Sequence, residues 1–144
     1  MKIHNEMKLS FPSKSCNEAF ARSVTAAFVL NLDPTLNELS DLKTAVSEAV
    51  TNAIVHGYRR QSGTIFLSGK ITDGGRVVIR IRDKGCGIDD VEQAMQPLFT
   101  TAPDEERAGL GFAVMQSFCD RVRVSSTPGK GTVVTLEKQI GGDD

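Results

Sequence analysis

The spacing of apolar residues changes near Gly57, and this change most limits the folds open to the chain. Before Gly57, residues 15–32 and 35–56 carry apolar side chains at helical spacing, which predicts two helices. After it, residues 64–71 and 76–82 are rich in branched apolar residues, which are typical of strands. The helical and strand segments are therefore grouped rather than alternating.

The predicted helix boundaries come from short polar motifs. Ser15 to Glu18 and Thr35 to Glu38 each fit a capping box, in which a hydroxyl and a carboxylate satisfy free backbone amides. Gly57 is placed to cap the end of the second helix. We expect one stripe of the first helix to face the core, formed by Phe20, Val24, Phe28 and Leu32.

The remaining elements complete a two-layer pattern. A strand is predicted at Met7–Phe11, short helices at 91–96 and 111–119, and hairpins at the turns Asp73-Gly74-Gly75 and Pro128–Gly131. Helices and strands that segregate in this way favour an α+β sandwich over a doubly wound sheet. We predict a single domain over residues 1–144, with a disordered tail at 140–144.

Composition and charge narrow the function classes. The 144 residues carry a formal net charge of -1, so we expect no direct nucleic-acid partner, which would require a basic surface. No apolar run approaches the roughly 20 residues of a membrane span, so we expect no membrane partner. Cys16, Cys86 and Cys119 are widely spaced and lack a metal-binding pattern, which indicates reduced thiols in a cytoplasmic protein.

The second predicted helix carries the first candidate for chemistry. Glu48 and Asn52 lie four residues apart, opposite the apolar stripe centred on Val46. A Glu/Asn pair on that side fits an ordinary solvated helix face. It also fits a carboxylate that accepts a hydroxyl proton beside an amide that binds Mg²⁺. The pair alone leaves both interpretations open.

Two glycine-rich segments are further candidates. Asp83-Lys84-Gly85-Cys86-Gly87 follows a predicted strand, and it fits either a turn or a site where Asp83 accepts a hydrogen bond from a flat heterocycle. Gly109-Leu110-Gly111 precedes a helix, where free amides can bind phosphate; a flexible turn is the alternative. Arg107 lies close enough upstream to reach a terminal phosphate.

Together the three segments resemble the ATP-binding boxes shared by DNA gyrase, Hsp90, histidine kinases and mismatch-repair ATPases. The resemblance implies the Bergerat fold, with helices on one face of a mixed, mostly antiparallel sheet. It also implies that Asn52 binds Mg²⁺, that Asp83 contacts adenine and that lid glycines surround the phosphates of ATP.

A closer resemblance extends over about Met7 to Glu137. Phe20-Ala-Arg22, Leu32-Asp-Pro-Thr35, the segment Ser47–Ile54, Gln96-Pro-Leu-Phe-Thr-Thr101 and Glu106-Arg107 through Phe112 are similar to the anti-sigma F factors of endospore-forming bacteria. That family is a homodimeric serine kinase that inhibits sporulation sigma factor F. It also phosphorylates a serine of an anti-anti-sigma protein.

Carried over by position, the resemblance makes Glu48 the catalytic base and Arg107 a contact of the terminal phosphate. It implies that Arg22 contacts the protein partners and that the N-terminal strand forms the dimer interface. Further ATP contacts are implied at Gly85, Gly87, Thr100, Thr101, Gly109, Leu110, Gly111 and Thr132. Ala102 departs from the lysine expected in close relatives.

The sequence therefore predicts an anti-sigma factor that is also a protein serine kinase using Mg-ATP. Within the family, a general-stress anti-sigma kinase is the nearest alternative. A second alternative is an ATP-dependent module that sequesters a sigma factor with little catalysis, although such a module would not need Glu48 and Arg107. A histidine kinase fragment is disfavoured, because no helical segment with an acceptor histidine is evident.

Overall fold

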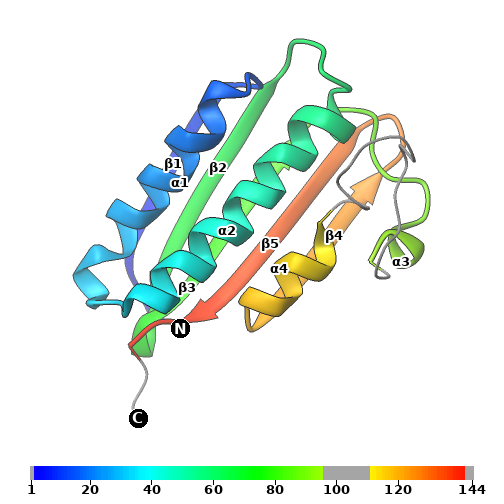
Figure 1. The fold of residues 1–144 in the computed structure, drawn as a ribbon. Coiled ribbons are helices and arrows are strands. Elements are labelled where there is room, and N and C mark those ends of the chain that lie inside the picture. The colour runs from blue at the N-terminus through cyan, green and yellow to red at the C-terminus, as the bar shows by residue number, and fades with distance from the viewer. Residues whose placement is uncertain (1, 96–110, 142–144) are drawn as a thin grey trace.

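The computed structural model describes residues 2–95 and 111–141, and it has two layers (Figure 1). Its elements in chain order are β1 (Ile3–Pro12), α1 (Cys16–Val29), a 3-10 turn (Leu30–Leu32), α2 (Leu36–Asn52), a π-helical turn (Ala53–Gly57), β2 (Thr64–Thr72), a 3-10 turn (Asp73–Gly75), β3 (Arg76–Asp83), α3 (Val91–Ala94), α4 (Phe112–Phe118), β4 (Arg121–Thr127) and β5 (Gly131–Gln139). The predicted α+β sandwich is confirmed.

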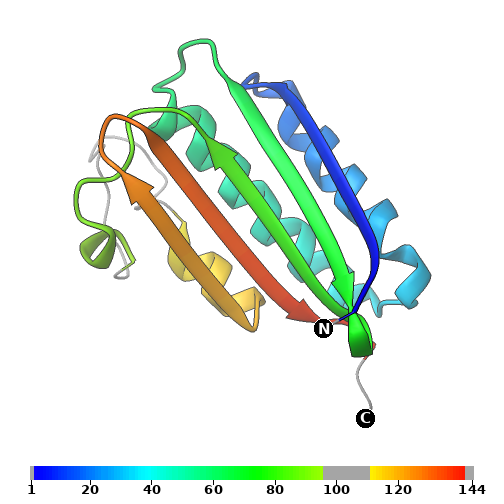
Figure 2. The same ribbon diagram turned by 180° about the vertical axis from the view of Figure 1, so that it is seen from behind.

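The five strands form one sheet in the order β1-β2-β3-β5-β4. Every recorded strand pair is antiparallel, so the described sheet is antiparallel throughout, where the resemblance implies a mixed one. Helices α1, α2 and α4 lie on one face of the sheet, and Figure 2 shows the opposite face uncovered by the described helices. The strand β1 forms one edge of the sheet.

The core lies between the sheet and the helical layer. Strand residues that point toward the helices are almost fully buried, among them Ile65, Leu67, Ile79, Ile81 and Leu136. Helix α2 supplies the facing apolar surface, with Leu42, Val46 and Val50 at 0% exposure. The predicted stripe centred on Val46 therefore faces the sheet, and this burial is the main stabilising contribution to the two-layer arrangement.

The two predicted capping boxes have different outcomes. At α2 the box is confirmed: the Thr35 hydroxyl accepts from the Glu38 amide at 3.0 Å, and the Glu38 carboxylate accepts from the Thr35 amide at 2.9 Å. At α1 the prediction is wrong, since Ser15 has helical backbone angles and makes no capping hydrogen bond. The Glu18 carboxylate instead pairs with the Arg22 guanidinium.

The buried face of α1 also differs from the expected stripe. Ala21, Thr25 and Val29 are fully buried, whereas Phe20 is 46% exposed. The buried stripe is thus rotated by one residue from the predicted one. Of the four predicted residues, Val24, Phe28 and Leu32 are partly buried against the core, so the expected face is displaced by one residue and Phe20 is the one that is exposed.

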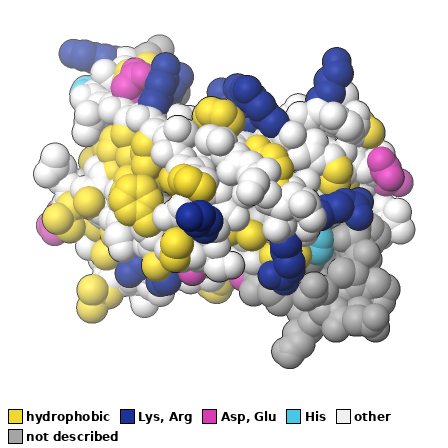
Figure 3. Space-filling model, turned by 90° about the horizontal axis from the view of Figure 1, so that it is seen from above, with side chains coloured by type: hydrophobic (Ala, Val, Ile, Leu, Met, Phe, Trp, Pro, Cys, Tyr) yellow, Lys and Arg dark blue, Asp and Glu magenta, His cyan; other side chains and the backbone are white. Residues whose placement is uncertain are grey.

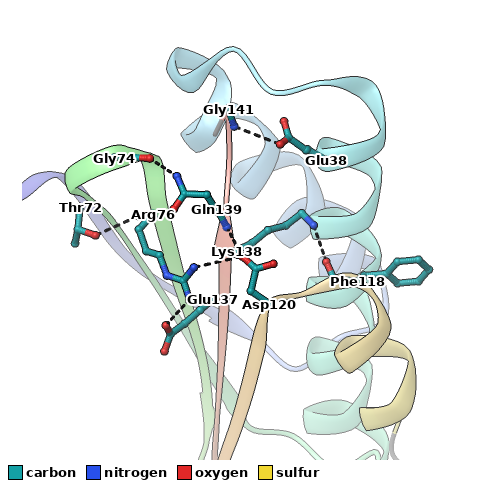
Figure 4. Close-up of polar contacts among 10 residues, drawn as sticks. All are labelled: Glu38, Thr72, Gly74, Arg76, Phe118, Asp120, Glu137, Lys138, Gln139 and Gly141. Atoms are coloured by element: carbon teal, nitrogen blue, oxygen red, sulfur yellow. Dashed lines mark hydrogen bonds and ion pairs between the residues drawn. The ribbon is translucent and has the colours of Figure 1, made fainter. Parts of the chain in front are cut away.

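Several hydrogen bonds fasten the end of β5 (Figure 4). This end lies far from Asp83, because β3 and β5 are antiparallel, with Asp83 opposite Thr132 and Arg76 opposite Gln139. Lys138 Nζ donates to the Phe118 carbonyl at 2.8 Å, and the Gln139 amide donates to Asp120 Oδ2 at 2.7 Å. Ile140 is 2% exposed, and its amide donates to the Gly75 carbonyl at 3.1 Å.

The ordered chain therefore extends past β5. The Gly141 amide donates to Glu38 Oε2 at 3.3 Å, which joins the C-terminal end to the start of α2 (Figure 4). The prediction of a disordered tail from residue 140 is wrong for Ile140 and Gly141. Residues 142–144 lie outside the described residues.

Candidate functional site

A cavity of about 440 Å³ lies where the C-terminal end of α2 meets the C-terminal end of β3. Its wall comes from α2, the π-helical turn and the residues just after it, β3 with the loop after it, α3, α4 and β5. The predicted site residues on this wall are Asn52, Asp83, Gly87 and Thr132. Segments far apart in the sequence are thus brought together around one hollow.

Glu48 and Asn52 lie on a half-buried side of α2. Asn52 lines the cavity. Glu48 lies one turn earlier, and its carboxylate packs against the start of α4. A Cβ atom placed on Gly111 would lie only 2.3 Å from Glu48 Oε1. One face of α2 therefore lies against both the cavity and Gly111, the residue before α4.

Gly57 has a different role from the predicted helix cap. It lies inside the π-helical turn, and the Tyr58 amide donates to the Ala53 carbonyl at 2.8 Å. A Cβ on Gly57 would lie 2.9 Å from the carboxylate atoms of Asp83. Glycine is required here because the backbone of the π-helical turn lies directly against the Asp83 side chain. Single π turns of this kind are frequent at functional sites.

Asp83 is the buried acid of the cavity, with 7% of its surface exposed. Burial raises the pKa of its carboxyl above the ordinary range, while hydrogen bonds from the Gly85 and Thr132 amides act in the opposite direction. The Gly85 amide donates to Asp83 Oδ1 at 2.9 Å. Because these amides hold the carboxylate against the cavity wall, Asp83 can accept a hydrogen bond from a ligand in a fixed direction.

The loop after β3 is shaped by its two glycines. A Cβ on Gly85 would lie 2.0 Å from the Gly57 carbonyl oxygen, so only glycine permits this approach. Gly87 has φ +78, and a Cβ there would meet the Thr127 carbonyl oxygen at 2.4 Å. The Cys86 amide between them donates to the Gly57 carbonyl at 2.8 Å. The loop is thereby fastened to both the π-helical turn and the β4–β5 hairpin.

Several cavity residues were not identified from the sequence. These residues are His56, Arg59, Arg60 and Cys86, all of which line the cavity. Arg59 and Arg60 have left-handed backbone angles, with φ of 52 and 64. Left-handed angles are unusual for residues other than Gly, Asn and Asp, so the sequence carried no signal for them. The apolar part of the wall includes Ile88, which belongs to a loop without regular periodicity.

The other predicted site residues lie elsewhere. Thr100, Thr101, Arg107, Gly109 and Leu110 lie outside the described residues, as does Ala102. Arg22 lies away from the cavity, in a separate groove between α1 and α2 that also contains Glu18, Leu36 and Lys43. Among residues 2–95 and 111–141, no group of three or more acidic, His or Cys side chains is arranged to hold a metal.

Comparison with known proteins gives this geometry a context. A family described as the histidine kinase-like ATPase domain matches residues 11–138. An anti-sigma F factor of Thermoanaerobacter sp. (strain X514) is 57% identical over 143 residues, which is 99% of each chain. The anti-sigma F factor of Priestia megaterium is 50% identical over 139 residues, covering 96% of this chain and 95% of the relative.

This chain belongs to the anti-sigma F factor family. Its ATPase domain is of the histidine kinase type, which implies that the chain binds ATP. No helix in the described part of the chain has the length and apolar character needed to cross a membrane.

Solved structures agree on the fold. A structure of the RsbU and RsbW domains of a Mycobacterium tuberculosis protein matches 94% of this chain with a TM-score of 0.69 and 18% identity, and the match spans 32% of that longer chain. The catalytic domain of the histidine kinase ThkA matches 93% of this chain with a TM-score of 0.59 and 14% identity. At such low identity these matches establish the fold alone.

Proposed function

We propose that this chain is a cytoplasmic protein serine kinase and anti-sigma factor. It uses Mg-ATP to phosphorylate a serine of an anti-anti-sigma protein, and it holds sporulation sigma factor F in an inactive complex. The observation that carries the kinase proposal is the arrangement along α2. Glu48 lies beside Gly111 before α4, Asn52 lines the cavity one turn further along the same helix, and Asp83 lies beside Gly57.

The described residues fit ATP. The spacing from Glu48 to Gly57 along a helix is roughly 13 Å, which separates an adenine end from a phosphate end. At the adenine end, Asp83 is a buried acceptor whose carboxylate is held by backbone amides. The wall also includes apolar side chains such as Ile81, Ile88 and Val134, as suits a flat heterocycle.

The phosphate end fits Mg²⁺ and a triphosphate. Asn52 offers an amide oxygen, and Mg²⁺ prefers few protein ligands because phosphates and water complete its shell. When bound, ATP supplies the phosphoryl group and Mg²⁺ offsets its negative charge. Gly111 begins α4 next to Glu48, so phosphate contacts from this segment would lie beside the proposed base.

Glu48 has the position of a general base in this proposal. Its carboxylate would accept the proton of the partner's serine hydroxyl and orient the oxygen for transfer. Arg107 would contact the terminal phosphate, and Thr100, Thr101, Gly109 and Leu110 would supply further contacts. Gly85, Gly87 and Thr132 would form the nucleotide side of the cavity.

The protein partners are proposed from the family. Relatives at 50–57% identity are named anti-sigma F factors, which favours sigma factor F over a general-stress sigma factor. Arg22 borders a groove on the outer side of the helices and would contact both protein partners. The exposed edge strand β1 would form the homodimer interface, since an unpaired strand edge readily adds a second chain.

The experiment is a phosphotransfer assay with labelled Mg-ATP and the candidate anti-anti-sigma protein. Glu48→Gln should retain ATP binding and lose transfer to serine. Glu92→Gln, which removes an exposed carboxylate of α3, is the matched control and should transfer normally. Transfer at the wild-type rate by Glu48→Gln would refute the base assignment. Absence of label with every variant, despite ATP binding, would instead favour a sequestering module with little catalysis.

A further inference from the structure

The face of the sheet opposite the helices is open, and the alternation of side chains decides what it displays (Figure 2). On β3, Val77, Ile79 and Ile81 point toward the helices and are buried. Arg80 and Arg82 alternate with them and are exposed. Strand register then places Lys8 of β1 opposite Ser68, which is opposite Arg80. One row across three strands thus carries basic side chains at both ends.

We call the basic hollow the surface formed by Lys8, Arg80, Arg82 and Lys84 around Phe66. A depression of about 480 Å³ is lined there by residues of β1, β2, β3 and β5, and no Asp or Glu is among its lining residues. In Figure 3, Lys and Arg side chains project along the upper edge of the view, on the side of the open sheet face.

The charges of the basic hollow are not neutralised by the described part of the chain. No ion pair involving Lys8, Arg80 or Arg82 forms among residues 2–95 and 111–141. Glu137, an acid of β5 on the open face, pairs with Arg76 at 3.0 Å and Arg123 at 2.6 Å instead. Since the whole chain has a net charge of -1, this concentration of positive charge is local.

Phe66 lies at the centre of the basic hollow and already has cationic partners. Arg82 lies 5.0 Å and Lys84 Nζ 5.1 Å from its ring centroid. Sheet surfaces that bind single-stranded nucleic acid use free aromatic rings on which bases stack. A single ring occupied by two cations does not provide such a platform. A second copy of this chain is also disfavoured at this face, because it would oppose like charges.

We propose that the basic hollow is a docking surface for an acidic segment of a protein partner. Carboxylates would pair with Arg80, Arg82 and Lys8, and an apolar contact with Val133 would add affinity beside them. Arg side chains are suited to this because their planar guanidinium groups bind carboxylates through two hydrogen bonds.

This surface is independent of the nucleotide site. Asp83 and Thr132 point into the helical side of the sheet, whereas Arg82 and Val133, their neighbours in sequence, point to the open side. A partner seated on the basic hollow therefore leaves the cavity accessible. Binding at this face does not require the proposed kinase activity.

The test measures binding of the intact protein to fluorescent poly-L-glutamate by anisotropy, with labelled oligo(dT) as a second probe. Arg80→Glu should weaken poly-L-glutamate binding about tenfold, because the reversal replaces an attraction with a repulsion. Lys14→Glu changes the net charge equally at an exposed residue beyond β1, and it should leave the affinity unchanged. If Arg80→Glu does not fold, Arg80→Gln is measured instead, and it should show a smaller loss of affinity for poly-L-glutamate.

Three results would overturn the proposal. If Arg80→Glu and Lys14→Glu lose the same affinity for poly-L-glutamate, the probe is attracted by the overall charge of the protein and not by this surface. Tighter binding of oligo(dT) that depends on Arg80 would assign the surface to nucleic acid. A change in self-association of Arg80→Gln by sedimentation equilibrium would assign it to a second copy. ATP binding, measured in parallel, should be the same in all variants whether or not the kinase proposal holds.

Discussion

Replacing Asp83 by Asn tests whether this carboxylate recognises the base of ATP. The substitution keeps size and shape and removes the negative charge, while one amide oxygen can still accept from the Gly85 amide. A hydrogen bond to a charged group contributes about 1.5–3 kcal/mol, so losing the charge predicts roughly a 10- to 150-fold weaker ATP affinity. Isothermal titration calorimetry with Mg-ATP measures this directly.

The same substitution has a predicted effect on stability. Burial raises the pKa of Asp83, so the folded protein binds its proton more tightly than the unfolded chain does. The contribution of Asp83 to the free energy of unfolding is therefore largest below its unfolded pKa of about 3.9 and is lost as pH rises through the raised folded pKa. Asp83→Asn removes this titration, and urea unfolding at several pH values should show a flatter dependence above pH of about 4.

A matched control separates recognition from general electrostatics. Asp89 also lines the cavity but is exposed, and Asp89→Asn removes the same charge from the rim. We expect Asp89→Asn to bind ATP as well as the parent or better, because it removes a repulsion from the phosphates. Unchanged ATP affinity in Asp83→Asn, or equal weakening in both variants, would refute the adenine role of Asp83.

Three further predictions concern a helix cap and two thiols. Thr35→Ala should lower the free energy of unfolding by about 1 kcal/mol and the Tm by a few degrees, because the Thr35 side chain makes a capping hydrogen bond. Ser15 makes no such bond, so Ser15→Ala should leave the Tm unchanged. Equal Tm shifts in a thermal melt would contradict this explanation. Thiol titration at pH 8 should leave Cys119 unreacted until the protein unfolds, because burial raises its pKa to about 11. Cys86 should react more slowly when Mg-ATP is bound, since it lines the cavity, and labelling that ATP does not slow would count against the proposed site.

Much of the fold followed from local patterns. The helical stripe centred on Val46, the strands 64–71 and 76–82 and the turn between them all appear in the structure within a residue or two. These predictions succeeded because the burial of one helix face or one strand face requires a period that is visible in the sequence. The change of period at Gly57 marks the real boundary between helices and sheet.

Identical local signals had different outcomes where tertiary packing intervened. Ser15 and Thr35 both begin capping-box motifs, but only Thr35 adopts the extended backbone that a cap requires, with φ -70 and ψ 163. Glu18 pairs with Arg22 on the next turn, which removes the second half of the box at α1. Propensity therefore placed the helices, while packing and side-chain pairing decided their ends and their buried faces.

In the candidate site, too, some features follow from the sequence and others only from tertiary packing. The sequence by itself singled out Glu48, Asn52 and Asp83 as candidates for the chemistry, because their segments resemble the ATP-binding boxes of the family. Only the tertiary structure decided that Gly57 lies against Asp83, that Glu48 packs beside Gly111 rather than in solvent, and that Arg80 and Lys8 share one open face. These relations depend on contacts between segments distant in the chain, and side-chain periodicity reports only how each segment is buried, not which other segment it meets.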